Sequence, residues 1–180
     1  MLYPKEVKEI LITKEQIEKR VKELGAQITK DYKGKNPLVV GVLKGSWIFL
    51  ADLVRQIDLG CTIDFIDIST YGSSTRSSGE VRFNKDFNYS VDGKDIIMVE
   101  DIIDTGITMN FIQNLLKTRG AASVRIASLL SKPERRKVEI NIDYLGFEIP
   151  DKFVIGYGLD FAEKYRGLEF IGVLHEECYK

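Results

Sequence analysis

Apolar positions along the chain follow two kinds of spacing, and the alternation between them predicts a fold of mixed helices and strands. Over residues 17–28 apolar side chains recur at three- to four-residue intervals, which is typical of a helix with one buried face. The segment Thr13-Lys14-Glu15-Gln16 before them has the form of a capping box, so we expect the helix to begin there. Residues 38–43 are instead a continuous apolar run, as expected of a strand buried on both faces.

Two further helices are predicted from the same spacing. One begins near Ser46, and the other covers about residues 108–118, with Gly120 beyond its end as a typical stop signal. The positions that we expect to face inward are Trp47, Leu50, Ala51 and Val54 in the first helix, and Ile112, Leu115 and Leu116 in the second.

The remaining apolar or alternating segments predict strands. Besides residues 38–43, these strands cover residues 61–70, 95–99, 124–130, 144–147, 153–155 and 170–174. Residues 81–91 favour a hairpin, and Asp92-Gly93 after it is a turn signal. Because strands and helices alternate without a linker, we predict a single α/β domain over residues 1–180 with a mainly parallel sheet.

Residues 71–80 interrupt this pattern. They include two Gly and four Ser and show no apolar periodicity, so we expect a flexible loop. Two interpretations stay open for it. The segment is either a disordered connector or an active-site lid, since long loops inside compact domains are often functional.

Composition and charge limit the classes of function that the chain can have. The 180-residue chain carries 26 Lys and Arg against 27 Asp and Glu, and its net charge of -1 gives no global reason to expect nucleic-acid binding. The single histidine, His175, excludes a His-rich zinc site and argues against Ser-His or Cys-His catalysis built on any other histidine.

The number of cysteines and the lengths of the apolar runs indicate where in the cell the protein is located. Cys61 and Cys178 are far apart and fit free thiols in a reducing compartment better than a disulfide framework. No apolar run approaches the roughly 18 residues that a membrane span requires, and residues 1–6 lack the apolar core of a signal peptide. We therefore expect a cytoplasmic protein without a membrane partner.

The strongest chemical signal is the string of residues 99–108. Glu100, Asp101 and Asp104 place three carboxylates in five residues at the carboxyl end of a predicted strand, the edge where open α/β sheets bind ligands. Glu100 and Asp101 suit ribose hydroxyls or Mg²⁺, because hard cations take oxygen ligands. An acidic loop that only caps the next helix is the alternative, and the length of the whole string favours a ligand site over it.

The second half of the string leads directly into a predicted helix. Gly106 lets the backbone approach a ligand closely, and the helix N-terminus offers unpaired N–H groups and a positive dipole. Thr105 and Thr108 add hydroxyl donors. This half therefore suits a phosphate monoester.

A second strand-to-helix junction lies at Leu43-Lys44-Gly45-Ser46. Gly45 and the backbone N–H groups there offer an anion site, although the order Lys-Gly-Ser is wrong for a Walker A loop. The alternative is an ordinary helix start capped by Ser46.

These motifs together resemble a known family. Residues 99–108 resemble the motif that binds 5-phosphoribosyl-1-diphosphate (PRPP) in type I phosphoribosyltransferases. Residues 38–174 resemble the 6-oxopurine branch of that family, the hypoxanthine-guanine enzymes, through residues 43–46, Ser131-Lys132 and residues 149–160. The resemblance implies a central, mainly parallel sheet flanked by helices, a small hood and a flexible lid of about residues 70–81, in a homodimer or homotetramer.

The resemblance also implies roles for single residues on the phosphate side. It assigns the ribose phosphate of PRPP to Glu100, Asp101, Asp104, Thr105, Gly106 and Thr108, and pyrophosphate to Lys44, Gly45 and Arg166. It predicts a cis peptide bond between Leu43 and Lys44, and a lid that begins at Thr70 and Tyr71. The cofactor that it implies is Mg²⁺, with Glu100, Asp101 and Asp160 as candidate ligands.

On the purine side, the resemblance implies that Lys132 binds the exocyclic O6, that Phe153 stacks on the ring and that Val154 offers its backbone to the base edge. Asp160 would lie near the 2-substituent. Asp104 is the candidate general base at the N7 edge. A cationic donor at O6 accepts a 6-oxo group and disfavours the amino group of adenine.

The implied reaction belongs to purine salvage. It transfers the 5-phosphoribosyl group from PRPP to N9 of hypoxanthine or guanine, giving IMP or GMP and pyrophosphate with Mg²⁺. A similar enzyme for another base, such as xanthine, is one alternative. The other is an RNA-binding regulator on the same fold, as in pyrimidine-operon attenuation proteins, but the balanced charge argues against the basic face that RNA requires.

Overall fold

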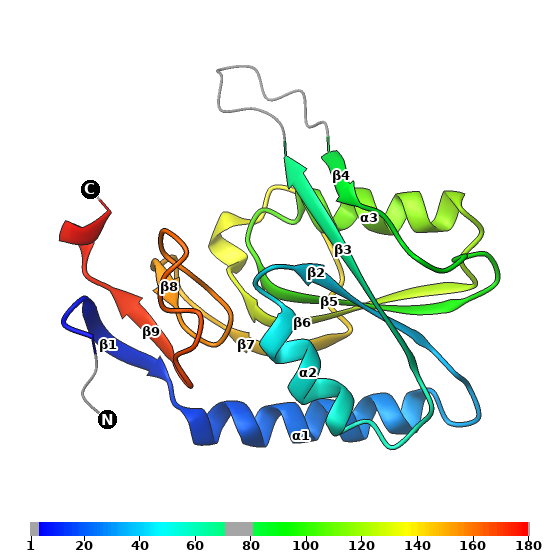
Figure 1. The fold of residues 1–180 in the computed structure, drawn as a ribbon, viewed down its shortest axis with the longest axis horizontal. Helices are drawn as coiled ribbons and strands as arrows, with labels where there is room; N and C mark the ends of the chain where they lie inside the picture. Colours follow the sequence, from blue (N-terminus) through cyan, green and yellow to red (C-terminus); the bar gives the residue numbers. More distant parts are fainter. Residues whose placement is uncertain (1–3, 71–80, 180) are drawn as a thin grey trace.

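The computed structural model describes residues 4–70 and 81–179, which form two sheets and the helices around them (Figure 1). A six-stranded sheet has the order β4-β3-β2-β5-β6-β7, and a three-stranded sheet has the order β1-β9-β8. The predicted α/β fold with a mainly parallel sheet is confirmed. Residues 71–80, expected to form a flexible lid or connector, lie outside the described residues.

The large sheet is parallel except at one edge. Its parallel strands are β2 (Leu38–Leu43), β3 (Thr62–Thr70), β5 (Asp95–Ile103), β6 (Ser123–Ser131) and β7 (Tyr144–Glu148). Strand β4 (Val81–Lys85) pairs antiparallel with β3. The central strands are apolar on both faces because helices cover both, as their continuous apolar runs predicted.

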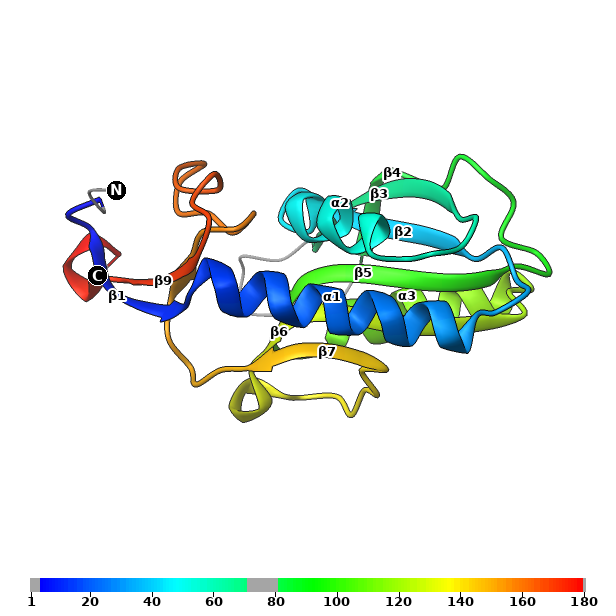
Figure 2. The same ribbon diagram turned by 90° about the horizontal axis from the view of Figure 1, so that it is seen from below.

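Three helices cover the two faces of this sheet. Helices α1 (Lys14–Asp31) and α2 (Trp47–Arg55) pack on one face, and α3 (Ile107–Thr118) packs on the other (Figures 1 and 2). The predicted capping box is present at the start of α1. There the hydroxyl oxygen of Thr13 accepts from the Gln16 backbone N–H, and the Gln16 side chain accepts from the Thr13 N–H.

The small sheet lies beyond the carboxyl ends of the central strands (Figure 1). Its strands are β1 (Val7–Ile12), β8 (Val154–Ile155) and β9 (Ile171–Leu174), paired antiparallel. We call this sheet the hood, and the segment between β8 and β9 the hood loop (residues 156–170). The sequence pattern did not predict β1, because its partner β9 lies about 160 residues away along the chain.

Two predictions about local structure are wrong. Residues 81–91 do not form a hairpin, because β4 pairs with β3 across residues 71–80 and no second strand follows it before β5. In α2 the buried positions are Phe49, Leu50 and Leu53, while Ala51 is exposed and Trp47 is 48% exposed. This short helix is apolar almost all round, so its spacing alone does not select the buried face.

Helix α3 differs less from its prediction than α2 does. Helix α3 buries Met109, Ile112 and Leu116, while Leu115 is only partly buried. Two short 3₁₀ turns, Pro133–Arg135 and Glu176–Cys178, complete the described elements. Cys61 and Cys178 are free thiols, as predicted. Among the described residues, no helix is long and apolar enough to cross a membrane.

Candidate active site

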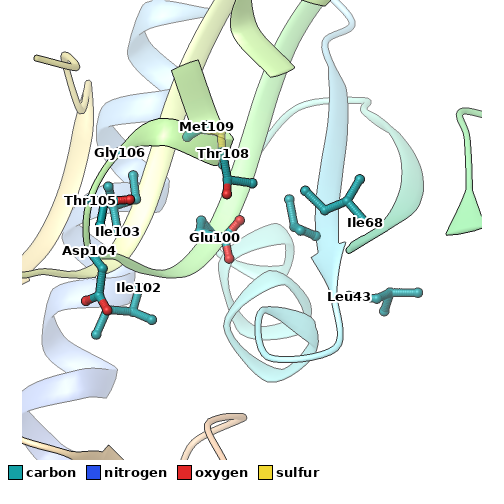
Figure 3. Close-up of a pocket in the computed structure, with 11 residues that line it drawn as sticks. Leu43, Ile68, Glu100, Ile102, Ile103, Asp104, Thr105, Gly106, Thr108 and Met109 are labelled. Carbon is teal, nitrogen blue, oxygen red and sulfur yellow. The ribbon is translucent and has the colours of Figure 1, made fainter. Parts of the chain in front are cut away.

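A cavity of about 300 Å³ lies at the carboxyl ends of β2 and β5 (Figure 3). Its lining residues are Val42, Leu43, Ile68, Glu100, Ile102, Ile103, Asp104, Thr105, Gly106, Thr108 and Met109. In Figure 3, Glu100 lies at the centre of this space with Thr108 beside it, and Asp104 lies at its margin. The structure thus brings most of the predicted ribose-phosphate residues around one cavity.

The turn at residues 104–108 has the backbone of an anion site. Gly106 has a φ of 80°, and a Cβ there would lie 2.9 Å from the Val138 carbonyl oxygen, so this position requires glycine. Helix α3 begins directly after it without a side-chain cap. The backbone N–H groups of Lys137 and Val138 donate to the Thr105 carbonyl and hold the turn from behind. The positive end of α3 therefore faces the cavity.

Asp104 has one buried carboxylate oxygen, Oδ1, with no hydrogen-bond partner among the described residues. Two cations lie near this carboxylate: Lys132 Nζ at 3.9 Å and Arg135 Nε at 3.8 Å. Lys132 is only 6% exposed, and its backbone N–H donates to the Ile103 carbonyl. Asp104 is therefore an available hydrogen-bond acceptor next to a buried cationic donor.

Glu100 and Asp101 form a carboxyl pair on β5. Removal from water raises the pKa of Glu100 well above its ordinary value, and the charge of Asp101 and a side-chain hydrogen bond between the two raise it further. Removal from water also raises the pKa of Asp101, although hydrogen bonds from Glu100 and from the Ile102 N–H, with the charge of Arg166, oppose this shift. Both carboxyl groups therefore favour a proton or a cation beside them.

The loop at residues 43–46, which we call the Lys44 loop, carries the predicted cis peptide bond between Leu43 and Lys44. A Cβ on Gly45 would lie 1.5 Å from Asp101 Oδ2, and a Cβ on Gly158 would lie 2.0 Å from the Gly45 carbonyl oxygen. The Lys44 loop is therefore enclosed between the Asp101 side chain on β5 and the backbone of the hood loop. Lys44 itself is exposed, and its Nζ lies 3.2 Å from Glu163.

Ser46 does not cap α2 through its side chain. Its buried hydroxyl donates instead to the Val42 carbonyl at 2.7 Å, which ties the loop back to β2. The interpretation of this junction as an ordinary Ser-capped helix start is therefore wrong.

The predicted purine residues lie where β6 ends and the hood begins. Lys132 follows β6, and its Nζ is 3.4 Å from Asp151 Oδ1. Phe153 is 36% exposed, stacks on Tyr179 with ring centroids 4.9 Å apart, and meets Phe161 edge-on. Val154 is buried in β8. A partly exposed ring that its aromatic neighbours hold in one orientation is suited to stacking on a flat heteroaromatic ligand.

Asp160 and Arg166 both lie on the hood loop and pair at 2.9 Å. Arg166 Nη1 also donates to the Gly158 carbonyl at 2.8 Å, and its buried Nε has no partner among the described residues. Asp160 accepts from the Glu163 backbone N–H. The hood loop thus presents a fixed guanidinium with a free donor close to the carboxylate of Asp101.

Some predicted site residues are not brought together. Within the described parts of the chain, no three His, Cys, Asp or Glu side chains form a ready cation cage, and Asp160 lies on the hood loop, paired with Arg166, rather than on β5 with Glu100 and Asp101. Of the predicted start of the lid, Thr70 ends β3, and Tyr71 lies outside the described residues. Nothing local in the sequence marks Glu163 as the partner of Lys44, because the two residues are 119 positions apart.

Comparison with known proteins shows the family of the chain. A family model described as "Phosphoribosyl transferase domain" matches residues 7–162. The chain is 50% identical over 175 residues to the hypoxanthine-guanine phosphoribosyltransferase of Bacillus subtilis, covering 97% of each chain.

The fold also matches solved structures of phosphoribosyltransferases. A hypoxanthine phosphoribosyltransferase from Staphylococcus aureus superposes with a TM-score of 0.94 at 49% identity, covering 97% of this chain and 95% of that one. The enzyme of that name from Trypanosoma cruzi superposes with a TM-score of 0.94 at 41% identity, covering 99% and 97%. The chain therefore belongs to the phosphoribosyltransferase family and is an enzyme of that class, as its motifs predicted.

Proposed function

We propose that this enzyme transfers the 5-phosphoribosyl group of PRPP to N9 of hypoxanthine or guanine, forming IMP or GMP and releasing pyrophosphate. The observation that carries the proposal is the position of buried Lys132 beside Asp104. Lys132 Nζ lies 3.9 Å from Asp104 Oδ1, which has no hydrogen-bond partner among the described residues. The edge of a 6-oxopurine offers an acceptor at O6 beside a proton at N7, which complements this cation and carboxylate. The names of the similar proteins support the same substrates.

Adenine has the opposite pattern at position 6. Its amino group would place a donor against the Lys132 ammonium, leaving both buried donors without an acceptor. A site that hydrogen-bonds one substrate group strongly rejects an analogue that lacks this group, because the site's own polar groups are then left unpaired. The exposed ring of Phe153 supplies an apolar face for stacking, which every purine can use and which does not discriminate between them.

The phosphate groups of PRPP would divide between two sites. The turn at residues 104–108 suits the 5′-phosphate through the backbone of α3 and the hydroxyls of Thr105 and Thr108. The Lys44 loop and the guanidinium of Arg166 suit the pyrophosphate, since Arg presents a planar fork of donors. Both lie at the same edge of the sheet, so one extended substrate would contact both.

In the reaction, the bond between C1′ and the pyrophosphate oxygen breaks with its electron pair on pyrophosphate, and the bond between N9 and C1′ forms. The proton released at the N7 edge of the base passes to Asp104, whose free oxygen is placed to accept it. Lys44 and Arg166 stabilise the negative charge that develops on the leaving group.

The residues present fit Mg²⁺ as the cofactor. Glu100 and Asp101 offer adjacent, partly buried carboxylates, which are the oxygen donors that Mg²⁺ prefers, and Asp160 is the third candidate. Mg²⁺ in such sites usually binds one or two carboxylates together with substrate phosphates. When bound it would supply positive charge to the diphosphate. A cytoplasmic location and a homodimer or homotetramer, without nucleic-acid or membrane partners, remain predictions.

A steady-state assay with PRPP, Mg²⁺ and each of hypoxanthine, guanine, xanthine and adenine tests the proposal. We expect nucleotide formation with hypoxanthine and guanine, and kcat/KM for adenine lower by a factor on the order of 10⁴. Adenine as the best substrate would refute the role of Lys132. Xanthine as the best base would keep the reaction but move the enzyme to another specificity.

A further inference from the structure

The hood loop and the Lys44 loop meet without any side chain between them, so something else must hold them in register. The Gly158 backbone lies against the Gly45 carbonyl, and Gly45 lies against the carboxylate of Asp101. Each of these contacts is van der Waals contact between backbone or small groups, which is individually weak. A shift of the hood loop by even 1 Å would therefore separate the two halves of the proposed pyrophosphate site.

Side-chain interactions of two kinds connect the hood loop to the segment formed by the Lys44 loop and α2. One is the ion pair of Lys44 with Glu163, whose side chains are 66% and 65% exposed. Exposed pairs of this kind contribute little to stability. The other is the hydrogen bond from the Tyr157 hydroxyl to Asp52 Oδ2 on α2.

Tyr157 is well suited to anchor the hood loop. It is only 7% exposed, and its backbone N–H donates to the Leu168 carbonyl at 2.8 Å, so both ends of the loop fix its position. It holds a φ of 48°, in the left-handed region that favours glycine, directly before Gly158. Burial and the bond to Asp52 raise the pKa of Tyr157, so the hydroxyl remains a donor.

Gly158, next to Tyr157, is bonded to Arg166 of the proposed pyrophosphate site. The Gly158 N–H donates to the Arg166 carbonyl, and the Arg166 side chain donates back to the Gly158 carbonyl. On the other side, α2 continues directly from the Lys44 loop. We propose that the hydrogen bond between Tyr157 and Asp52 positions the Lys44 loop against the hood loop, and so sets the affinity for pyrophosphate and PRPP. This inference rests on the proposed function of that site.

The variant Tyr157→Phe removes the hydroxyl and keeps the ring. We expect KM for PRPP to rise about fivefold, which corresponds to roughly 1 kcal/mol, with KM for hypoxanthine and kcat changed less than about twofold. The protein should still fold, because Asp52 keeps its ion pair with Arg55 and lines two open cavities of about 260 and 350 Å³ that admit water.

Four further variants separate positioning from stability. Asp52→Ala should reproduce the effect of Tyr157→Phe, the double variant should be no worse than either, and Asp52→Asn should restore part of the PRPP affinity because its amide oxygen still accepts. Tyr144→Phe is the matched control. Its buried hydroxyl donates to Asp31 at the opposite end of the sheet, so it should lower stability and leave both KM values unchanged.

Binding of Mg²⁺-pyrophosphate, measured by titration calorimetry, supplies a readout that does not depend on turnover. Weaker binding in Tyr157→Phe than in both the wild type and Tyr144→Phe supports the inference. Equal pyrophosphate affinities, or a rise in both KM values alike, would overturn it. Failure of the wild type to make nucleotide would refute the proposed function, and the pyrophosphate titration would still decide whether Tyr157 positions the loop.

Discussion

Gly45 tests whether the close packing of the Lys44 loop is required for activity. The substitution Gly45→Ala adds a single Cβ, which would lie 1.5 Å from Asp101 Oδ2 and 2.5 Å from its Cγ, whereas real Cβ atoms essentially never approach within 3.0 Å. One of the two groups must therefore move by about 1.5 Å. The Asp101 carboxylate resists this, because its Oδ1 accepts from the Ile102 N–H at 2.7 Å.

The size of the effect follows from that displacement. A misplacement of about 1 Å at a catalytic site costs on the order of 100-fold in rate. We therefore expect kcat/KM for PRPP to fall about 100-fold in Gly45→Ala, which corresponds to roughly 2.7 kcal/mol. Stability should change less, because the carboxylate can turn away at the expense of one hydrogen bond, about 1 kcal/mol or a few degrees in Tm.

Gly60→Ala is the matched control for this prediction. No heavy atom lies within 4 Å of the position a Cβ would take at Gly60, and its backbone is not left-handed. Steady-state kinetics with PRPP as the varied substrate and thermal unfolding of both variants provide the measurement. A Gly45→Ala enzyme with wild-type kcat/KM would refute the reasoning, as would an equal loss in Gly60→Ala.

Three other substitutions test the remaining parts of the structure. Asp104→Asn should lower kcat about 100-fold or more with the fold unchanged by circular dichroism, and full activity would exclude Asp104 as the base. Lys132→Gln should narrow the preference for hypoxanthine over adenine, measured as a ratio of kcat/KM values, because an amide both donates and accepts. Burial raises the pKa of Asp64, but hydrogen bonds from Phe65 and Asn88 and the nearby Lys85 lower it overall, so its stabilisation should be present above about pH 4 and lost as the pH falls. Urea unfolding of Asp64→Asn should therefore show a deficit of roughly 2–4 kcal/mol at pH 7 that shrinks towards pH 3, and a deficit independent of pH would contradict this.

The ligand-binding edge of the sheet could be predicted from the sequence because its signal is local. Residues 99–108 place a buried strand, three acids, a glycine and a helix start within one short string, and each has a meaning at its own position. The structure gathers Glu100, Asp104, Thr105, Gly106 and Thr108 around one cavity accordingly. The roles of these residues toward a substrate remain predictions.

Contacts between distant segments could not be predicted in the same way. Tyr157 and Asp52 are 105 residues apart, and each would be an ordinary residue in its own element. The pattern of residues 81–91 predicts a hairpin, but β4 pairs with β3, which lies on the other side of residues 71–80 in the chain. In α2, nearly every position is apolar, so the spacing of apolar residues does not show which face is buried. Packing against α1 and the sheet determines that face.

The balanced charge of the chain also has a structural explanation. Each cation expected to bind the ligand already has a carboxylate partner, and the pairs are Lys44–Glu163, Lys132–Asp151 and Arg166–Asp160. The Lys44–Glu163 pair is exposed on both sides and is therefore weak, so a phosphate can replace the carboxylate at little cost. Lys132 and Arg166 are mostly buried, so a ligand group that displaces their carboxylates must itself accept hydrogen bonds from them. The same pairs hold the long cationic side chains near their working positions before the ligand arrives, which lowers the conformational entropy lost on binding. A site for a polyanion is therefore compatible with a net charge of -1, because the enzyme carries its own exchangeable counter-ions.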